Sequence, residues 1–252
     1  MIGVLAIGNS FSQDATAYLE DLAACGGAEA RVVNLYIGGC PLSAHWRNAQ
    51  NDLAAYDYQL RGVGTGKKVS IRQALLERDW DVVTLQQASG DSGLWQTYQP
   101  YLGDLSAYVK KYAPRARQMI HETWAYETDS AHPAFGQYGK SQRTMYLALR
   151  AAYRKAAAAL GADWIPCGDA IQALRALKPF DYPHGGLSLC RDGYHMHLVY
   201  GRYAAAAVWY ETVLGGNILK NPFAPRVGLP ADEALLKLEA RTVHDVCARP
   251  EA

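Results

Sequence analysis

The chain has 252 residues, of which 50% are hydrophobic and 19% charged, and its formal net charge is +1. Such a chain can bury a substantial core, and we expect one domain over residues 1–252. The small net charge and the lack of a long basic run argue against nucleic acid as a partner, and no apolar run reaches the length of a membrane span. The composition leaves the oligomeric state open, a homo-oligomer included.

Cysteine usage and the amino terminus bear on the compartment. The five cysteines are scattered along the chain without a Cys-x-x-Cys pair, which argues against a disulfide framework or structural zinc and favours a reducing compartment. No charged and apolar leader precedes the first predicted strand, so no signal peptide is recognised. We therefore predict a cytoplasmic protein.

Strand and helix patterns alternate along most of the chain. Residues 4–7 form a short apolar run, typical of a strand buried on both faces, and a helical pattern follows over residues 15–22. This alternation predicts a parallel sheet with helices on both faces. Further strands are predicted at residues 30–37, 80–85, 117–123 and 163–167, and helices at residues 71–78, 98–113, 141–160, 168–177, 198–214 and 230–247.

Residues 56–70 depart from this alternation. Two short strand-like runs flank a glycine-rich segment, which predicts a solvent-exposed β-hairpin insertion. The glycines resemble a phosphate-binding loop only superficially, because no helix with Gly-Lys-Ser or Gly-Lys-Thr follows them. We therefore discount nucleotide binding and predict no cofactor.

Ser10 lies on the turn after the first predicted strand, where Gly8 and Asn9 permit a sharp change of direction. Open α/β sheets bind ligands at the carboxyl ends of their strands, and N–H groups at the start of the next helix can stabilise developing negative charge. The spacing of Ser10 and Gln13 also fits a capping box, in which Ser10 would only begin the helix. Both interpretations stand at this point.

Asp192 and His195 lie three residues apart before a predicted helix. The spacing allows the carboxylate to accept a hydrogen bond from one ring nitrogen while the other nitrogen faces a cleft. A serine nucleophile requires such an oriented base. Alone, Asp-x-x-His is a weak signal, but together with Ser10 it is informative.

Four short motifs follow one another along the chain: Gly-Asn-Ser-Phe-Ser at residues 8–12, Gly-Gly at 38–39, Gln-Gln at 86–87 and Asp-Gly-Tyr-His at 192–195. The first and last resemble the Gly-Asp-Ser and Asp-x-x-His blocks of the SGNH, or GDSL, hydrolases. The glycine pair matches the family's glycine block. The glutamine pair stands where Gly-x-Asn-Asp belongs, and this pattern is similar to the sialate and acetylxylan esterase branch, in which a Gln stands at the end of that strand. The sequence is thus similar to this family over most of its length.

The resemblance implies a flavodoxin-like three-layer α/β/α sandwich with a mostly parallel sheet, and a serine esterase activity. Carried over by position, Ser10 would be the nucleophile, His195 the general base and Asp192 the acid that orients it. Asn9 stands where the family usually has Asp.

The resemblance also implies an oxyanion hole. The backbone N–H of Ser10 and that of Gly39 (or Gly38) would hold the oxyanion, together with a side-chain amide from the third motif. Gln86 is the favoured donor and Gln87 the alternative, because strand alternation lets only one of them face the cleft.

The aromatic residues suggest the substrate. The chain has 17 Tyr and 6 Trp but only 4 Phe, a balance that suits a wet cleft in which sugar rings stack. We predict an esterase that removes small acyl groups, acetyl above all, from a small-molecule or oligosaccharide ester. A lipase, thioesterase or short-chain carboxylesterase with the same triad is the first alternative, and a non-catalytic carbohydrate-binding protein the second. The candidate substrate contacts are Trp46, His121, Trp124 and Tyr126.

Two further chemistries are weighed and disfavoured. His184, His195 and His197 with Asp192 could bind a metal ion, but residues two apart diverge at the entry to a helix. Cys40 could act as a nucleophile, but no histidine partner is evident for it. We predict no metal site.

Overall fold

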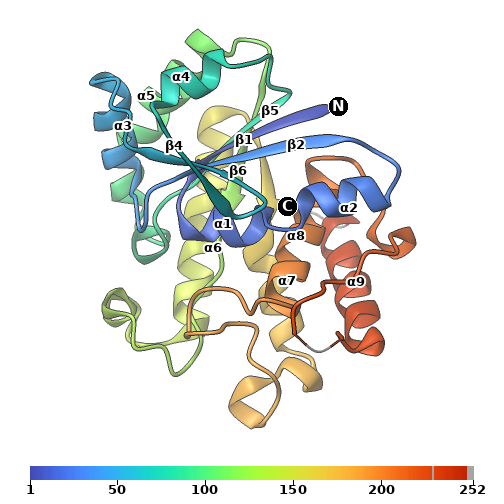
Figure 1. Ribbon diagram of the computed structural model, residues 1–252. Helices are drawn as coiled ribbons and strands as arrows, with labels where there is room; N and C mark the ends of the chain where they lie inside the picture. Colours follow the sequence, from blue (N-terminus) through green and yellow to red (C-terminus); the bar gives the residue numbers. More distant parts are fainter. Residues whose placement is uncertain (229, 249–252) are drawn as a thin grey trace.

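The computed structural model describes residues 1–228 and 230–248 of the chain (Figure 1). Within these residues, seven strands form one sheet: β1 (Ile2–Gly8), β2 (Ala30–Tyr36), β3 (Tyr56–Leu60), β4 (Val63–Val69), β5 (Val82–Leu85), β6 (Arg117–Glu122) and β7 (Asp163–Pro166). Their order in the sheet is β4-β3-β2-β1-β5-β6-β7. The pairs from β2 through β1, β5 and β6 to β7 are parallel, whereas β3 runs antiparallel to β2 and β4 antiparallel to β3.

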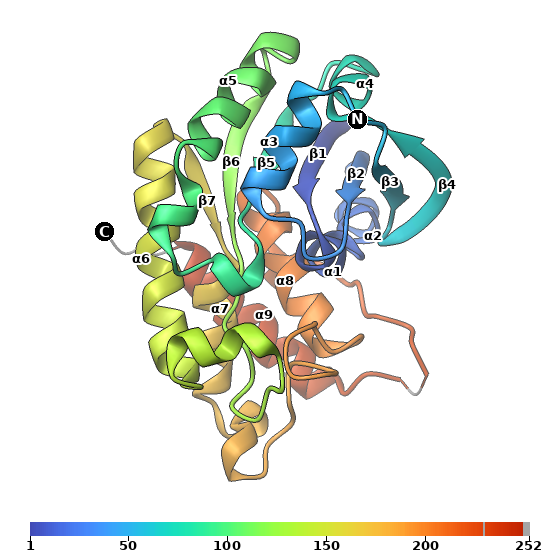
Figure 2. The ribbon, with the colours of Figure 1, turned by 90° about the vertical axis from the view of Figure 1, so that its left-hand side faces the viewer.

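Helices cover both faces of this sheet. They are α1 (Ser10–Thr16), α2 (Leu19–Cys25), α3 (Leu42–Gln50), α4 (Ile71–Leu76), α5 (Tyr101–Tyr112), α6 (Gln142–Leu160), α7 (Cys167–Arg175), α8 (Tyr200–Thr212) and α9 (Glu233–Ala248). Short 3₁₀ helices lie at Ser89–Asp91, Trp95–Tyr98, Pro133–Tyr138, Lys178–Phe180, Tyr182–His184 and Ile218–Lys220. Helices α3 to α6 lie along one face and α1, α2 and α8 along the other, with α7 and α9 packed on α8 (Figure 2). No helix in the described part of the chain has the length and apolar character that a membrane span requires.

The predicted three-layer α/β/α sandwich with a mostly parallel sheet is confirmed. Strand β1 lies between β2 and β5, and its residues 4–7 are at most 1% exposed because helices cover both of its faces. Chain order reverses at this strand, so its carboxyl end is the topological switch point where such sheets bind ligands. Figure 2 shows that β1 points its arrowhead at α1.

Two helices differ from the prediction. The helix expected over residues 15–22 is divided into α1 and α2, and α1 ends at Thr16, whose hydroxyl donates to the Ser12 carbonyl (2.7 Å). Helix α3 was not predicted. Its first N–H, that of Leu42, donates to the side chain of Gln87 (2.9 Å), so a partner 45 residues away stabilises its start.

The predicted hairpin exists, but it extends the main sheet. Strand β3 pairs with β2 from Val33↔Leu60 to Tyr36↔Asp57, and its Tyr56 is fully buried. Only β4 is exposed, over residues 63–68, and it ends the sheet with two lysines that discourage pairing with another chain. The prediction of a solvent-exposed hairpin therefore holds for one of its two strands.

Helix α9 buries a carboxyl group, that of Glu239, which is 0% exposed. Neither oxygen has a hydrogen-bond partner within residues 1–228 and 230–248, and burial raises the pKa of this group well above its ordinary value. The folded chain therefore keeps a proton that the unfolded chain loses above a pH of about 4.3. The contribution of this group to stability falls as the pH rises from that value.

We expect Glu239→Gln to stabilise the protein at pH 7 by about 1–2 kcal/mol, which raises Tm by several degrees. The gain should shrink as the pH approaches 4, where Glu239 is protonated in both states. Thermal unfolding followed by circular dichroism over this pH range measures both effects. Glu233→Gln, at an exposed position on the same helix, is the control. Equal pH dependence of the wild type and Glu239→Gln would contradict the expectation.

Candidate active site

Ser10 is the first residue of α1 and is half-buried. Asn9, not Ser10, is the N-cap: its Oδ1 accepts from the N–H of Phe11 (2.9 Å), and its own N–H donates to the hydroxyl of Ser12 (3.0 Å). The alternative in which Ser10 caps the helix through Gln13 is therefore wrong. Capping by Asn9 leaves the Ser10 hydroxyl available for other contacts.

The structure brings Ser10, His195 and Asp192 together. The Nε2 atom of His195 lies 2.8 Å from the Oγ of Ser10, and its Nδ1 lies 2.7 Å from the Oδ2 of Asp192. The predicted convergence is confirmed across 185 positions of sequence. The His195 side chain is 20% exposed and that of Asp192 40%, so the group is accessible from solvent.

Asp192 determines which nitrogen of His195 carries the proton. Its second oxygen accepts from the backbone N–H groups of His195 (2.8 Å) and Tyr194 (3.2 Å). Partial burial opposes ionisation, but these bonds and the imidazole outweigh it and lower the pKa of Asp192. The ionised carboxylate only accepts, so the hydrogen-bond network assigns the proton to Nδ1. Nε2 is then free to accept the proton of Ser10.

The loop that carries Asp192 and His195 has a constrained shape. An antiparallel bridge between Cys190 and Met196 closes it. Gly193 at its tip has φ +86°, and a Cβ there would lie 3.0 Å from the Cα of Ser130. Both the positive φ and this close approach favour glycine.

Gly39 lies at the same edge of the sheet as Ser10, because β1 and β2 are parallel. It is exposed in the turn after β2, with φ +61°. The side-chain amide of Asn9 donates to the carbonyl of Cys40 (3.4 Å), which links this turn to the turn that carries Ser10. The N–H of Ser10, as the first in its helix, has no intrahelical acceptor.

Gln87 does not face the site, and the prediction that it donates to an oxyanion is wrong. Its amide nitrogen donates to the carbonyl and the hydroxyl of Thr97 (both 3.0 Å), and its oxygen accepts from Leu42. The residue is 0% exposed. A buried amide at the end of a strand needs such partners, and here it joins two neighbouring loops.

The side chain of Gln86 also forms its hydrogen bonds inside the protein. Its amide nitrogen donates to the Oδ1 of Asn9 (2.9 Å), and its oxygen accepts from the Nδ1 of His121 (2.8 Å). The residue is 2% exposed and lies beneath the turn at Gly8. Gln86 therefore orients the cap of α1, and the prediction that its amide donates to an oxyanion is wrong as well.

Three of the four predicted substrate contacts are sealed from solvent, because Trp124, His121 and Tyr126 are all 0% exposed. The prediction that they contact substrate is therefore wrong. Burial lowers the pKa of His121 to about 3, so its imidazole is neutral. The hydroxyl of Tyr126 bonds that of Ser89 (2.9 Å).

Trp124 has a different role. Its indole N–H donates to the carbonyl of Tyr194 (2.8 Å), and its ring stacks on Phe11 at 4.5 Å. It thus joins the loop of His195 to the helix of Ser10. Trp46, the fourth predicted contact, is half-buried on α3 with its ring edge against Tyr108, and its role stays a prediction.

Comparison with known proteins was made on sequence and on structure. Residues 3–242 match a family model described as a domain of unknown function, DUF4886. A crystal structure of a DUF4886 family protein from Bacteroides uniformis is 36% identical, covers 100% of this chain and 96% of its own, and superposes with a TM-score of 0.90. The chain belongs to the DUF4886 family. A comparison with curated proteins found no match.

More distant solved structures share the fold of the chain described here. One of them, assigned to the SGNH hydrolases, is from Slackia heliotrinireducens and is 24% identical to this chain. The match covers 84% of this chain and 98% of that one, with a TM-score of 0.55. Another is a catalytic mutant of Axe2, an acetylxylan esterase from Geobacillus stearothermophilus, which is 16% identical to this chain. The match covers 83% of this chain and 93% of that one, with a TM-score of 0.52. At these identities the likeness shows the SGNH-type fold alone.

Two residues beside His195 were missed by sequence analysis of the DUF4886 protein. The ring centroid of Tyr194 lies 4.3 Å from that of His195, and His132 packs edge-on against Tyr194 at 4.8 Å. Both are half-buried. Tyr194 lies inside the Asp-x-x-His motif and could have been singled out, whereas nothing in the local pattern marks His132.

Neither disfavoured chemistry gains support in the DUF4886 protein. His184, His195 and His197 do not form a group arranged to hold a metal ion within the described residues. Cys40 does have a histidine partner, because the Nδ1 of His45 lies 3.6 Å from its sulfur, and the prediction that it has none is wrong. Burial raises the pKa of Cys40 to about 12, so it stays a protonated thiol and a poor nucleophile.

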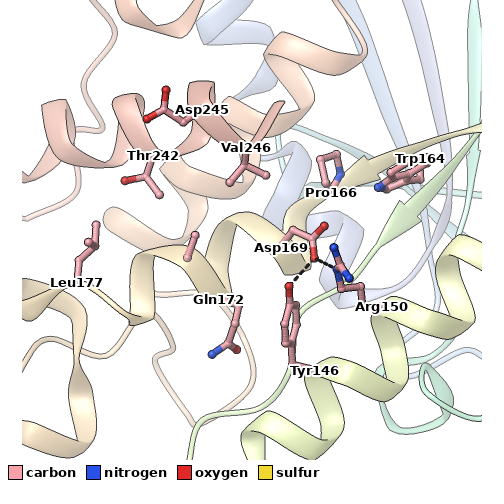
Figure 3. Close-up of a pocket in the computed structure, with 11 residues that line it drawn as sticks. Tyr146, Arg150, Trp164, Pro166, Asp169, Gln172, Leu177, Thr242, Asp245 and Val246 are labelled. Carbon is pink, nitrogen blue, oxygen red and sulfur yellow. Dashed lines mark hydrogen bonds and ion pairs between the residues drawn. The ribbon is translucent and has the colours of Figure 1, made fainter. Parts of the chain in front are cut away.

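A surface hollow of about 490 Å³ lies apart from these residues, between α6, α7 and α9 (Figure 3). Asp169 lies at its floor and accepts from the hydroxyl of Tyr146 (2.7 Å) and from Arg150 (3.0 Å). Its lining includes no member of the Ser10–His195–Asp192 group. This distant ionic group therefore provides a reference for substitutions at the candidate active site.

Proposed function

We propose that the protein is a serine esterase that removes acetyl groups from a hydroxylated substrate, a carbohydrate ester in particular. The observation that carries the proposal is the unbroken chain from Asp192 through His195 to Ser10, with contacts of 2.7 and 2.8 Å. These distances lie in the range required for proton transfer between a nucleophile and its base.

In the proposed reaction, the Oγ of Ser10 attacks the acyl carbon while Nε2 of His195 takes its proton. Asp192 stabilises the imidazolium that forms. The tetrahedral oxyanion is held by the N–H groups of Ser10 and Gly39, and each such donor is worth about 3 kcal/mol of transition-state stabilisation. His195 then protonates the leaving alkoxide, which leaves an acyl ester on Ser10. A water molecule, deprotonated by His195, attacks the acyl carbon of this ester. The bond between the acyl carbon and Oγ then breaks, His195 returns the proton to Oγ of Ser10, and the acid is released.

Two observations support the substrate class. Tyr194 packs on His195 and His132 packs on Tyr194, and both half-buried residues have flat rings that carry polar atoms, which suit contact with hydroxylated rings. The shared fold with Axe2 is consistent with this class, because Axe2 is an acetylxylan esterase.

The experiment compares acetate release from acetylated sugars with hydrolysis of p-nitrophenyl acetate, butyrate and octanoate. We expect turnover of the acetylated sugars and of p-nitrophenyl acetate, with rates that fall as the acyl chain lengthens. Preference for octanoate would overturn the proposed substrate class in favour of a lipase. Sugar binding without turnover of any ester would overturn the esterase itself.

A further inference from the structure

Asp14 is a buried carboxylate on α1, one helical turn after Ser10. It is 0% exposed, yet both of its oxygens have partners. Arg191 donates to both oxygens (3.1 and 3.0 Å), the Nε of Arg202 donates at 2.8 Å, and the backbone N–H of Met196 donates at 2.8 Å. A buried charge is tolerated when it is paired and hydrogen-bonded in this way.

Two of the partners of Asp14, Arg191 and Met196, lie next to residues of the triad, whereas Arg202 belongs to α8. Arg191 directly precedes Asp192, and Met196 directly follows His195. Arg191 also donates to the carbonyl of Met196, so one arginine joins both ends of the loop. A single carboxylate on the helix of the nucleophile therefore holds both ends of the loop that carries the base.

Two other contacts hold this loop. The indole of Trp124 donates to the carbonyl of Tyr194, and the N–H of Glu127 donates to the carbonyl of Gly193 (2.7 Å). Both act at the middle of the loop and come from the segment after β6. Asp14 is distinct because it bonds the loop directly from the helix of Ser10, whereas Trp124 reaches that helix only through its ring contact with Phe11.

We propose that Asp14 is a positioning residue that maintains the contact between His195 and Ser10. The inference rests on the proposed esterase function, since the contact matters for catalysis only if Ser10 is the nucleophile. Without the carboxylate, the loop loses its ionic bonds to α1 while its middle stays attached. His195 then spends less time within reach of Ser10, and a misplacement of about 1 Å in such a pair costs about 100-fold in rate.

The test compares Asp14→Asn with Asp169→Asn. Asp169 is the matched control because it is also largely buried (14% exposed) and also pairs with two arginines, Arg150 and Arg154. Figure 3 shows its contact with Arg150. Both variants should lose thermal stability. Only Asp14→Asn should lower kcat for p-nitrophenyl acetate, by about 10- to 100-fold, with KM changed less than threefold.

A second measurement does not depend on turnover. The Nδ1 proton of His195, bonded to Asp192, should give a downfield proton resonance, which we expect to shift or broaden in Asp14→Asn but not in Asp169→Asn. If the wild type hydrolyses no ester, the proposed function fails while this resonance still tests the positioning role. An unchanged resonance together with an unchanged kcat in Asp14→Asn would overturn that role.

A milder variant covers the case in which Asp14→Asn does not fold. Arg191→Gln removes the ion pair between Arg191 and Asp14. The side chain of Arg191 is 30% exposed, so the substitution leaves no large cavity. We expect a smaller decrease in kcat than for Asp14→Asn, again with little change in KM. Wild-type kcat and an unshifted His195 resonance in Arg191→Gln would contradict the inference.

Discussion

Ser10→Ala is expected to lower kcat for p-nitrophenyl acetate by about 10⁴- to 10⁶-fold, because alanine has no oxygen that can form the acyl-enzyme. The fold should be retained, since Asn9 and not Ser10 caps α1. Steady-state kinetics measures the decrease. Mass spectrometry after treatment with a fluorophosphonate should find one adduct in the wild type, on the peptide that contains Ser10, and none in the variant.

The control is Ser141→Ala. The hydroxyl of Ser141 caps α6 by accepting from Thr144, so its loss should lower Tm by a few degrees and leave kcat within a few-fold of the wild type. Turnover by Ser10→Ala at more than a hundredth of the wild-type rate would exclude Ser10 as the nucleophile.

Asp192→Asn is expected to lower kcat by about 10³- to 10⁴-fold with little effect on KM. The amide can donate to Nδ1 of His195, which moves the ring proton to Nε2, and His195 then cannot accept the proton of Ser10. Because the N–H groups of His195 and Tyr194 and the imidazole lower the pKa of Asp192, the carboxylate stays ionised in mildly acidic solution.

The chain contains a matched control for this substitution. Asp181 and His184 have the same spacing, and their side chains are 2.9 Å apart, but His184 is 80% exposed. Asp181→Asn should therefore leave kcat unchanged. Comparable activity in Asp192→Asn and Asp181→Asn, measured by steady-state kinetics from pH 5 to 9, would show that Asp192 does not orient the base.

These two Asp-x-x-His pairs show which part of the candidate site can be predicted from the sequence. Their spacing is identical, but only the pair at residues 192–195 belongs to the series of motifs that resembles the family. The tertiary structure distinguishes them directly, because His195 meets Ser10 whereas His184 lies on an exposed 3₁₀ helix. Spacing predicts a local pair, but the third member comes from a segment far away in the sequence.

The prediction placed the residues that follow the strands at the correct edge of the sheet. It was wrong about their side chains, which it directed into the cleft. Gln86, Gln87 and Trp124 all follow strands that end near Ser10. The end of a strand predicts where the following residues begin. Whether the side chains of those residues are buried depends on the loops that pack above them. Here the loops cover these side chains, and their polar atoms bond neighbouring turns and the loop of His195.

The amino-acid sequence by itself determined the alternation of strands and helices, the turn at Ser10 and the local pair at Asp192 and His195. Each of these depends on side-chain periodicity or on spacing within a few residues. Only the tertiary structure decided that His195 meets Ser10 and that Asp14 holds the loop of His195. The bonds of Asp14 span 177 to 188 positions, and no local pattern encodes a contact that exists only when the sheet and its helices are assembled.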